Sequence, residues 1–168
     1  MVIFLDLDET LVHAIPGRKG NPGARFVVTC KDGTTFWVRE RPIAKRIIAD
    51  CRALGIVRIL TGSTFDYASE VCQRAGFDFE PSDILSQEAF VVQNGEKYEP
   101  ARCETCPQAF LIDNAEPRSI ASKLKMQFLG IPLDRYLRFR TFRGGRESRA
   151  VDEEWTFLFS SFFHATAA

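Results

Sequence analysis

A short apolar segment that ends abruptly in carboxylates, Val2 to Asp8, constrains the fold of this chain more than any other. Residues 2–5 are apolar without alternation, which is typical of a central parallel strand covered on both faces. Asp6 and Asp8 follow, and on an extended chain this spacing places both side chains on one face at the strand's carboxyl end. Ligands of open α/β sheets bind at this edge. Because two neighbouring carboxylates repel each other, the edge needs a cation, a shared proton or solvent. We interpret it as a Mg²⁺ site with a nucleophilic aspartate; the alternative is a solvated strand end.

Two further segments repeat this design, an apolar strand followed by polar residues. The first covers residues 56–60 and leads into Thr61 just before a helical pattern. The second covers residues 108–112 and leads into Asp113 and Asn114. Alternating strands and helices predict a parallel sheet with right-handed crossovers, so the three strand ends should converge.

Thr61 and Gly62 are candidates for phosphate binding, because the backbone N–H groups and the dipole of the following helix favour an anion there. The simpler alternative is that Ser63 or Thr64 caps the helix. A phosphoryl site also needs an ammonium group. Lys97 is the only lysine between the second and third strand ends, and we therefore take it as the candidate, although a lone surface lysine usually has no function.

The remaining pattern predicts one domain over residues 1–168. A segment rich in Gly and Pro follows the first strand, and Asp32-Gly33 has the pattern of a hairpin turn. Together they predict a small flap over about residues 15–40. Helical periodicity predicts helices over residues 43–54, 65–75, 117–129 and 152–163. In the third of these we expect Ile120, Ala121, Leu124 and Phe128 to face inward.

The string Asp6-Leu-Asp8-Glu-Thr10 resembles motif I of the haloacid dehalogenase phosphotransferases. Extended to His13, it is similar to the branch of small phosphatases that act on the C-terminal tail of RNA polymerase II. Further similarity to this branch lies at residues 38–42, 60–63, 67–68 and 112–114. The resemblance implies an α/β fold, a Rossmann-like parallel sheet flanked by helices, with a small β-hairpin flap and no large cap domain.

The resemblance also implies roles for individual residues. Asp6 would attack phosphorus to form an aspartyl-phosphate, and Asp8 would protonate the leaving oxygen and then deprotonate water. Mg²⁺ would be held by the Asp6 carboxylate, the Asp8 backbone carbonyl and either Asp113 or Asn114. The phosphoryl oxygens would be held by Thr61, Gly62 and Lys97.

The charge distribution leaves the substrate open. A small flap gives an open site, which favours a macromolecule such as a protein carrying phosphoserine or phosphothreonine. The polymerase-tail enzymes carry a substrate-contacting arginine in a segment that corresponds to residues 75–96, but this segment contains no lysine or arginine here. Arginines crowd residues 135–149 and could bind nucleic acid or a phosphorylated partner, or could form a solvated face. The alternatives to a protein phosphatase are thus a polynucleotide end phosphatase and a small-metabolite phosphatase. A third alternative is a non-catalytic relative that only binds its partner. It is disfavoured because Asp6, Asp8, Lys97 and Asp113 are all present.

Five cysteines are scattered through apolar patterns, which suits a reducing compartment better than a disulfide framework. The pair Cys103-x-x-Cys106 lacks a second pair or a nearby histidine, so we interpret it as structural or incidental. No signal peptide or membrane-spanning run is evident. We therefore expect an intracellular protein, cytoplasmic or nuclear, with no membrane partner.

Overall fold

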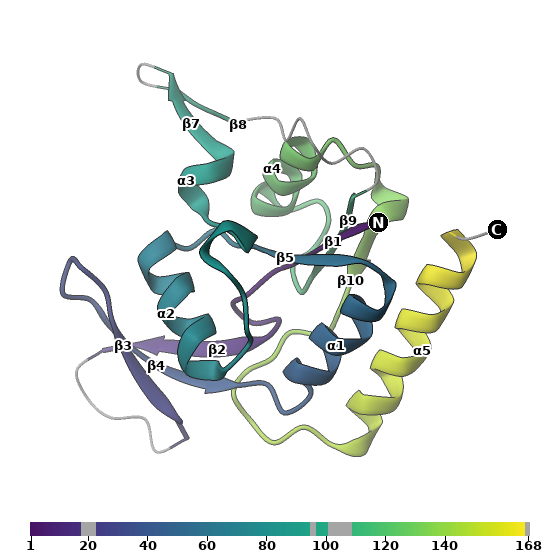
Figure 1. Cartoon of the computed structure of the whole chain (residues 1–168), viewed down its shortest axis with the longest axis horizontal. Coiled ribbons are helices and arrows are strands. Elements are labelled where there is room, and N and C mark those ends of the chain that lie inside the picture. Colours follow the sequence, from purple (N-terminus) through teal and green to yellow (C-terminus); the bar gives the residue numbers. More distant parts are fainter. Residues whose placement is uncertain (18–22, 95–96, 101–108, 167–168) are drawn as a thin grey trace.

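The computed structural model describes residues 1–17, 23–94, 97–100 and 109–166, and for 90–94, 97–100 and 164–166 it describes the backbone alone. The centre of the molecule is a five-stranded sheet in the order β10-β9-β1-β5-β6, in which every pair is parallel (Figure 1). Its strands are β1 (Val2–Leu5), β5 (Ile56–Leu60), β6 (Ile84–Leu85), β9 (Ala109–Asp113) and β10 (Tyr136–Arg138). The sheet confirms the predicted fold class.

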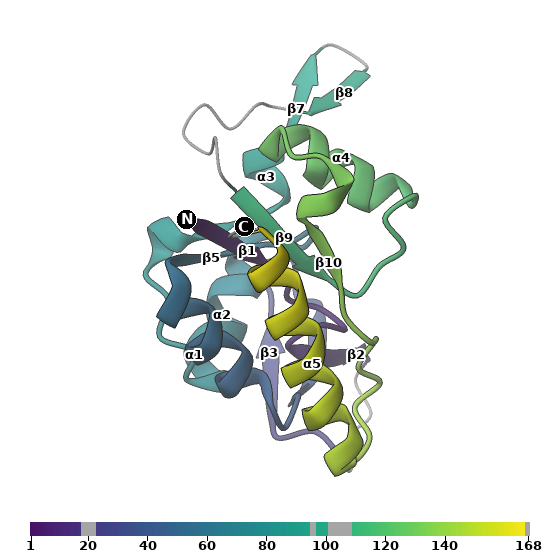
Figure 2. The same ribbon diagram turned by 90° about the vertical axis from the view of Figure 1, so that its right-hand side faces the viewer.

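Helices cover both faces of this sheet because successive residues of β1 point to opposite sides. Ile3 and Leu5 belong to the larger core, which packs against α1 (Ala44–Leu54), α2 (Phe65–Ala75) and α5 (Arg149–Thr166). Phe4 belongs to a second core on the other face, formed with α4 (Ile120–Leu129). Figure 2 shows α4 on one side of the sheet and α1 with α5 on the other. The uniformly apolar β1 is therefore buried from both sides, as predicted.

The flap is a three-stranded antiparallel sheet in the order β2-β4-β3. It consists of β2 (Val12–Pro16), β3 (Phe26–Thr29) and β4 (Thr35–Glu40), so the predicted hairpin gains a third strand from the residues that follow Asp8. Positive φ at Glu9 turns the chain between β1 and β2. The flap is thus joined directly to the strand that carries the two aspartates.

The remaining elements are short or peripheral. They are η1 (Pro81–Asp83), α3 (Gln87–Phe90), β7 (Val91–Asn94), β8 (Lys97–Pro100) and η2 (Leu133–Arg135). The hairpin β7-β8 projects from the body of the molecule (Figures 1 and 2). In the described part of the chain, no helix is both long enough and apolar enough to cross a bilayer.

One predicted helix is rotated about its axis relative to the expectation. Ser119 caps α4 by accepting a hydrogen bond from the Ser122 backbone at 3.2 Å, so the helix starts after Pro117. Ile120 is 80% exposed and Ala121 is exposed, whereas Lys125 is 5% exposed. The expectation that Ile120 and Ala121 face inward was therefore wrong, because polar contacts of Ser122 and Lys125, rather than apolar burial, determine which side of the first turns faces the sheet.

Arg41 joins the chain after Asp8 to the C-terminal third. Its side chain is fully buried, donates to the Thr10 carbonyl at 2.9 Å and pairs with Glu147 at 2.7 Å. Its guanidinium lies 4.2 Å from the centre of the Phe139 ring. The buried guanidinium thus makes two polar contacts and stacks on an aromatic ring. These contacts fix the relative position of the segments that carry Thr10, Arg41 and Glu147.

We predict that Arg41→Met lowers the free energy of unfolding by about 3 kcal/mol, because breaking a buried pair leaves the Glu147 carboxylate without its partner. The control is Arg46→Met, which removes an arginine that pairs with Asp152 but is 41% exposed, and which should cost less than about 1 kcal/mol. Urea denaturation of both variants measures the difference. Equal losses would contradict the assigned role of Arg41.

Candidate active site

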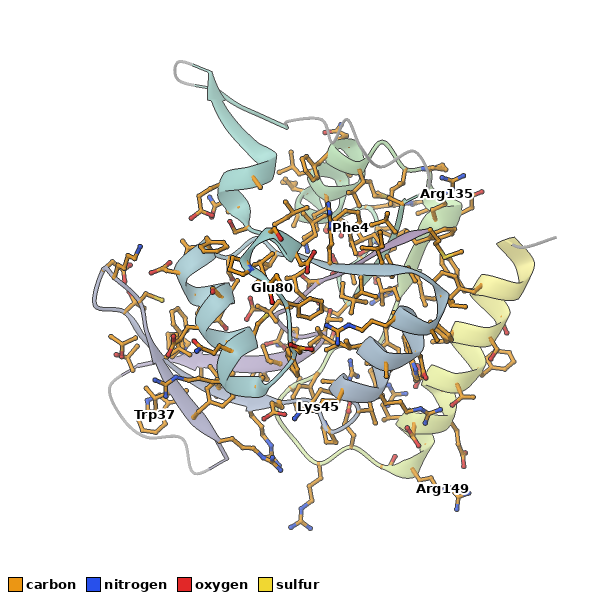
Figure 3. The ribbon with its side chains drawn as sticks, in the orientation of Figure 1. Phe4, Trp37, Lys45, Glu80, Arg135 and Arg149 are labelled. Atoms are coloured by element: carbon orange, nitrogen blue, oxygen red, sulfur yellow. The ribbon has the colours of Figure 1, made fainter. Side chains whose placement is uncertain are left out.

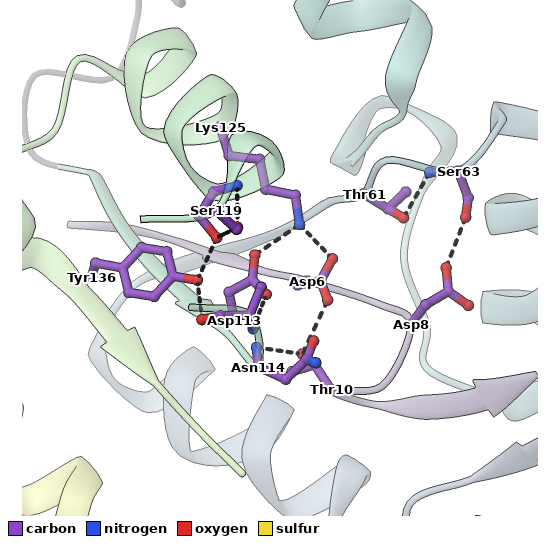
Figure 4. A network of polar contacts seen from close by, with 12 residues as sticks. Asp6, Asp8, Thr10, Thr61, Ser63, Asp113, Asn114, Ser119, Lys125 and Tyr136 are labelled. Carbon is purple, nitrogen blue, oxygen red and sulfur yellow. Dashed lines mark hydrogen bonds and ion pairs between the residues drawn. The ribbon is translucent and has the colours of Figure 1, made fainter. Parts of the chain in front are cut away.

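The three predicted strand ends lie side by side, because β9, β1 and β5 are neighbours in the sheet. Asp6 follows β1, Asp113 ends β9 and Thr61 follows β5, and all three are at most 5% exposed. The backbone N–H of Asp6 donates to the Ile112 carbonyl at 2.9 Å, which aligns the two aspartates across neighbouring strands. Figure 4 shows their side chains converging on one point.

That point is occupied by the ammonium group of Lys125, which reaches down from α4. Its Nζ lies 2.7 Å from Asp6 Oδ1 and 2.8 Å from Asp113 Oδ2 (Figure 4). Burial lowers the pKa of Lys125, but the two carboxylates outweigh it, so the pKa is raised and the lysine is charged. Burial raises the pKa of Asp6 to about 7 although Lys125 opposes the shift, and Asp113 and Asp8 add to it. One ammonium group thus does not fully compensate the buried carboxylates.

A small polar network fixes the start of α4 over this site. Ser122 Oγ and Tyr136 Oη lie 3.0 Å apart, and Tyr136 donates to the carbonyl of Ala115 at 2.9 Å. Asp113 Oδ1 accepts from the Ala115 backbone N–H at 2.9 Å. The loop after β9 and the first turn of α4 are therefore tied together, which orients Lys125 toward the aspartates.

On the other side of Asp6, oxygen atoms gather around the side chain of Asn114. Thr10 Oγ1 lies 3.0 Å from Asp6 Oδ2 and 3.1 Å from Asn114 Oδ1, and its single proton can be donated to either oxygen. With its amide turned over, the Asn114 nitrogen would instead donate to the Asp8 carbonyl at 3.2 Å and to Asp6 Oδ2 at 3.3 Å. The end of the Asn114 side chain therefore faces three acceptors, the third being Thr10 Oγ1, which suits its nitrogen; its oxygen in the same position could serve as a ligand to a cation.

This donor set fits Mg²⁺. It offers one carboxylate, one amide and one backbone carbonyl, all of them oxygen ligands, and Mg²⁺ typically takes one or two carboxylates and keeps several waters. No group of three or more histidine, cysteine, aspartate or glutamate side chains suited to a metal occurs among the described residues. The arrangement favours Asn114 over Asp113 as the direct ligand, since Asp113 Oδ1 accepts from the Ala115 N–H and Asp113 Oδ2 is paired with Lys125.

Asp8 points away from Asp6, toward the loop between β5 and α2. Its carboxylate accepts from Ser63 Oγ at 2.8 Å and from Tyr67 Oη at 2.6 Å. Burial and the charge of Asp8 both raise the pKa of Tyr67, which therefore stays protonated as a donor. The chain is no longer extended after Leu5, so the two aspartates share the sheet edge but do not share partners, unlike the extended geometry expected from their spacing.

Thr61 is buried and accepts from the Ser63 backbone N–H at 3.1 Å, which leaves its hydroxyl proton to donate to a ligand. Gly62 lies in the same turn, and open space surrounds the position that its Cβ would occupy. The helix α2 begins only at Phe65, with no side-chain cap bond from Thr64. Thr64 is thus the N-cap residue by position, as one of the two alternatives expected, but its hydroxyl donates to Asp66 and does not satisfy the N–H groups of the helix.

The structure brings to the site a lysine that the sequence analysis did not anticipate, while the role expected of Lys97 stays a prediction. Lys97 begins β8 in the projecting hairpin, and its side chain lies outside the described part, whereas Lys125 contacts both aspartates. Sequence reasoning missed Lys125 because the apolar pattern of its helix was assigned the wrong inward face. The sequence did contain one indication of this role: Lys125 is flanked by apolar residues on the helix that follows the third strand. Cys103 and Cys106 also lie outside the described residues.

The arginines expected to form a basic surface are dispersed, and several of them are paired with acidic side chains. Arg138 pairs with Glu116 at 2.5 Å, and Arg140 pairs with Glu154 at 2.8 Å. Arg149 pairs with Glu153 on its own helix at 3.1 Å. Figure 3 shows Arg135 and Arg149 far apart on the molecule. Their distribution favours the alternative of a solvated surface rather than a continuous site for nucleic acid.

A family model described as NLI interacting factor-like phosphatase matches residues 1–99. The chain belongs to this family. Of the site residues, Asp113, Asn114 and Lys125 lie beyond the matched region, and the others lie within it. A comparison with curated proteins found no match.

Two solved structures share the fold of this member of the NLI interacting factor-like phosphatases. One is a variant of the fission yeast RNA polymerase II CTD phosphatase Fcp1 bound to beryllium fluoride, with a TM-score of 0.51, 16% identity, and coverage of 95% of this chain and 50% of that one. The other, Fcp1 described as an essential RNA polymerase II CTD phosphatase, gives a TM-score of 0.55 and 16% identity, with coverage of 93% and 48%. This chain therefore spans about half the length of those structures, and the likeness concerns the fold.

We predict that Lys125→Met lowers the free energy of unfolding by roughly 3–5 kcal/mol, because it leaves two buried carboxylates facing each other without a cation. Lys123→Met, a matched control at an exposed position of the same helix, should cost no more than about 0.5 kcal/mol. Adding Asp113→Asn to Lys125→Met should recover part of the loss. Chemical denaturation measures all three, and a Lys123 effect as large as that of Lys125 would refute the assignment.

Proposed function

We propose that this protein is a Mg²⁺-dependent phosphomonoester hydrolase that acts through an aspartyl-phosphate on Asp6, with phosphoserine or phosphothreonine of a protein as substrate. Membership of a phosphatase family supports the reaction class. The single observation that carries the mechanism is the Asp6 carboxylate, held between the ammonium of Lys125 and the oxygen atoms around Asn114. A dianionic phosphate can approach an anionic nucleophile only where positive charge is fixed beside it.

In the first step, an Asp6 oxygen attacks phosphorus and the bond between phosphorus and the ester oxygen breaks. Asp8 gives a proton to the leaving oxygen. In the second step Asp8 takes a proton from water, the water oxygen bonds to phosphorus, and the bond between phosphorus and Asp6 breaks to release inorganic phosphate. Ser63 and Tyr67 orient Asp8 throughout, and their hydroxyl oxygens can donate or accept, so they can serve both of its protonation states.

Lys125, the hydroxyl of Thr61 and the backbone at Gly62 hold the phosphoryl oxygens as negative charge develops on them. Lys125 takes the role that the sequence suggested for Lys97. Mg²⁺, when bound by Asp6, the Asp8 carbonyl and Asn114, supplies Lewis acidity and neutralises charge. Asp113 positions Lys125 and supports the site from behind. We further propose that the chain forms one catalytic domain and works inside the cell, in keeping with free thiols at Cys30, Cys51 and Cys72.

Hydrolysis of p-nitrophenyl phosphate tests the reaction. Asp6→Asn should lower kcat by at least about 10³-fold, because an amide cannot serve as the nucleophile. Asp78→Asn is the control for the same chemical change at an exposed aspartate and should keep wild-type kcat. Loss of activity in EDTA and its return with Mg²⁺ are expected. Full activity of Asp6→Asn, or of a verified metal-free enzyme, would refute the mechanism.

The choice of metal ligand has its own test. Asn114→Ala should raise the Mg²⁺ concentration for half-maximal activity by roughly tenfold or more, since one of the few protein ligands is lost. Thr141→Ala removes only the hydroxyl that accepts from Asn114 Nδ2 at 3.3 Å and should shift this concentration much less. A Mg²⁺ titration of the activity of both variants measures these concentrations. An unchanged Mg²⁺ requirement in Asn114→Ala would refute the assignment of Asn114 as a ligand.

A further inference from the structure

A cleft of about 750 Å³ opens beside Asp8, between the flap and the first turn of α2. The flap contributes Ala14, Phe36 and the turn between β3 and β4, and the opposite wall is formed by residues 63–67 with Gln87 and Glu88. Asp8 lies both in this cleft and next to the phosphoryl site. When a phosphorylated residue of a peptide is bound there, the residues that flank it in the peptide lie in the cleft. The walls of the cleft therefore determine which flanking residues can bind.

The walls of the cleft are strongly acidic. Besides Asp8, four carboxylates line it, and the one ammonium among the lining residues is that of Lys31. These four are Glu9, Asp32, Asp66 and Glu88. Glu9 approaches His13 and Arg143, but Asp32, Asp66 and Glu88 have no lysine, arginine or histidine of the described residues within ion-pair distance. The cleft thus presents a negative field that Lys31 and the partners of Glu9 neutralise only in part.

Two of these carboxylates are held in the ionised form by hydrogen bonds. Asp66 accepts from the Lys31 backbone N–H at 3.0 Å and from Thr64 Oγ1 at 2.6 Å, which lowers its pKa. Partial burial would raise the pKa of Glu88, but hydrogen bonds from Ser86 and from backbone N–H groups outweigh it and lower the pKa. Both groups are therefore anionic at neutral pH, and both have oxygen lone pairs to spare for a ligand.

Aromatic rings stand next to these charges. Phe36 and Tyr67 pack with ring centres 4.9 Å apart, and Phe65 is 39% exposed beside Asp66. Lysine and arginine side chains combine an apolar stem with a cationic head, so they can lie along such rings and reach the carboxylates. Acidic residues and the phosphates of a nucleic acid would be repelled by the same walls.

We propose that this cleft selects phosphoserine or phosphothreonine flanked by lysine or arginine, and that Asp66 and Glu88 determine this preference. The inference rests on the proposed phosphatase function, whose site it extends. It separates the present chain from an enzyme for polynucleotide ends and from one for densely phosphorylated segments, because additional phosphates would have to enter the acidic cleft. Electrostatic selection of this kind should weaken as salt is added.

The test compares two fluorescent phosphoserine peptides of equal length, one with lysine and arginine around the phosphate and one with glutamate and aspartate. Fluorescence anisotropy with the Asp6→Asn protein measures binding without turnover, and kcat/KM of the wild type measures hydrolysis. At low salt the basic peptide should be preferred by about tenfold or more in both measurements. The double variant Asp66→Lys, Glu88→Lys should lose or reverse the preference, and taking the ratio within each variant cancels any loss of folded protein.

Glu80→Lys is the matched control, a charge reversal at an exposed acid that does not line the cleft, and it should keep the wild-type ratio. Equal binding of the two peptides, tighter binding of the acidic peptide or of a 5′-phosphorylated oligonucleotide, or an unchanged ratio in the double variant would overturn the inference. Absence of p-nitrophenyl phosphate hydrolysis would instead overturn the proposed function, while the anisotropy ratio would still decide the preference of the cleft.

Discussion

The site depends on keeping two carboxylates, Asp6 and Asp113, buried next to each other at the end of neighbouring strands. Each is forced into position by the register of β1 against β9, and their mutual repulsion must be balanced by fixed positive charge. Lys125 supplies part of that charge and brings α4 with it. The proposed binding of Mg²⁺ rests on the remaining negative charge, because a site with more buried carboxylates than fixed cations favours a further cation. The same imbalance would destabilise an ordinary core.

The sheet was predictable because its strands are marked by uninterrupted apolar residues and end in Gly, Pro or polar residues. β1, β5 and β9 lie as the sequence indicates, and so do α1 and α2, whose apolar positions recur at helical spacing. Since parallel strands bring their ends to one edge, the convergence of Asp6, Thr61 and Asp113 followed from the order of elements alone. These are the parts of the molecule in which burial of apolar groups determines the conformation.

The parts that could not be predicted are those in which polar contacts compete with apolar burial. In α4 the apolar residues suggested one inward face, but the ion pairs of Lys125 and the hydrogen bond of Ser122 to Tyr136 required another, which left Ile120 in solvent. Likewise, the direction of the Asp8 side chain depends on Ser63 and Tyr67, which are remote in sequence. Periodicity contains no information on such pairings, so a lysine from the last third of the chain was missed.

The buried bond between Arg41 and Glu147 has a consequence for the order in which the molecule is assembled. Arg41 also binds the carbonyl of Thr10, so the turn that carries the aspartates is completed only by a residue more than a hundred positions later. During synthesis on a ribosome, the chain emerges from its N-terminus, and the first strand must wait for partners that have not yet been made. The turn that carries the aspartates therefore cannot reach its fully bonded conformation until Glu147 has left the exit tunnel.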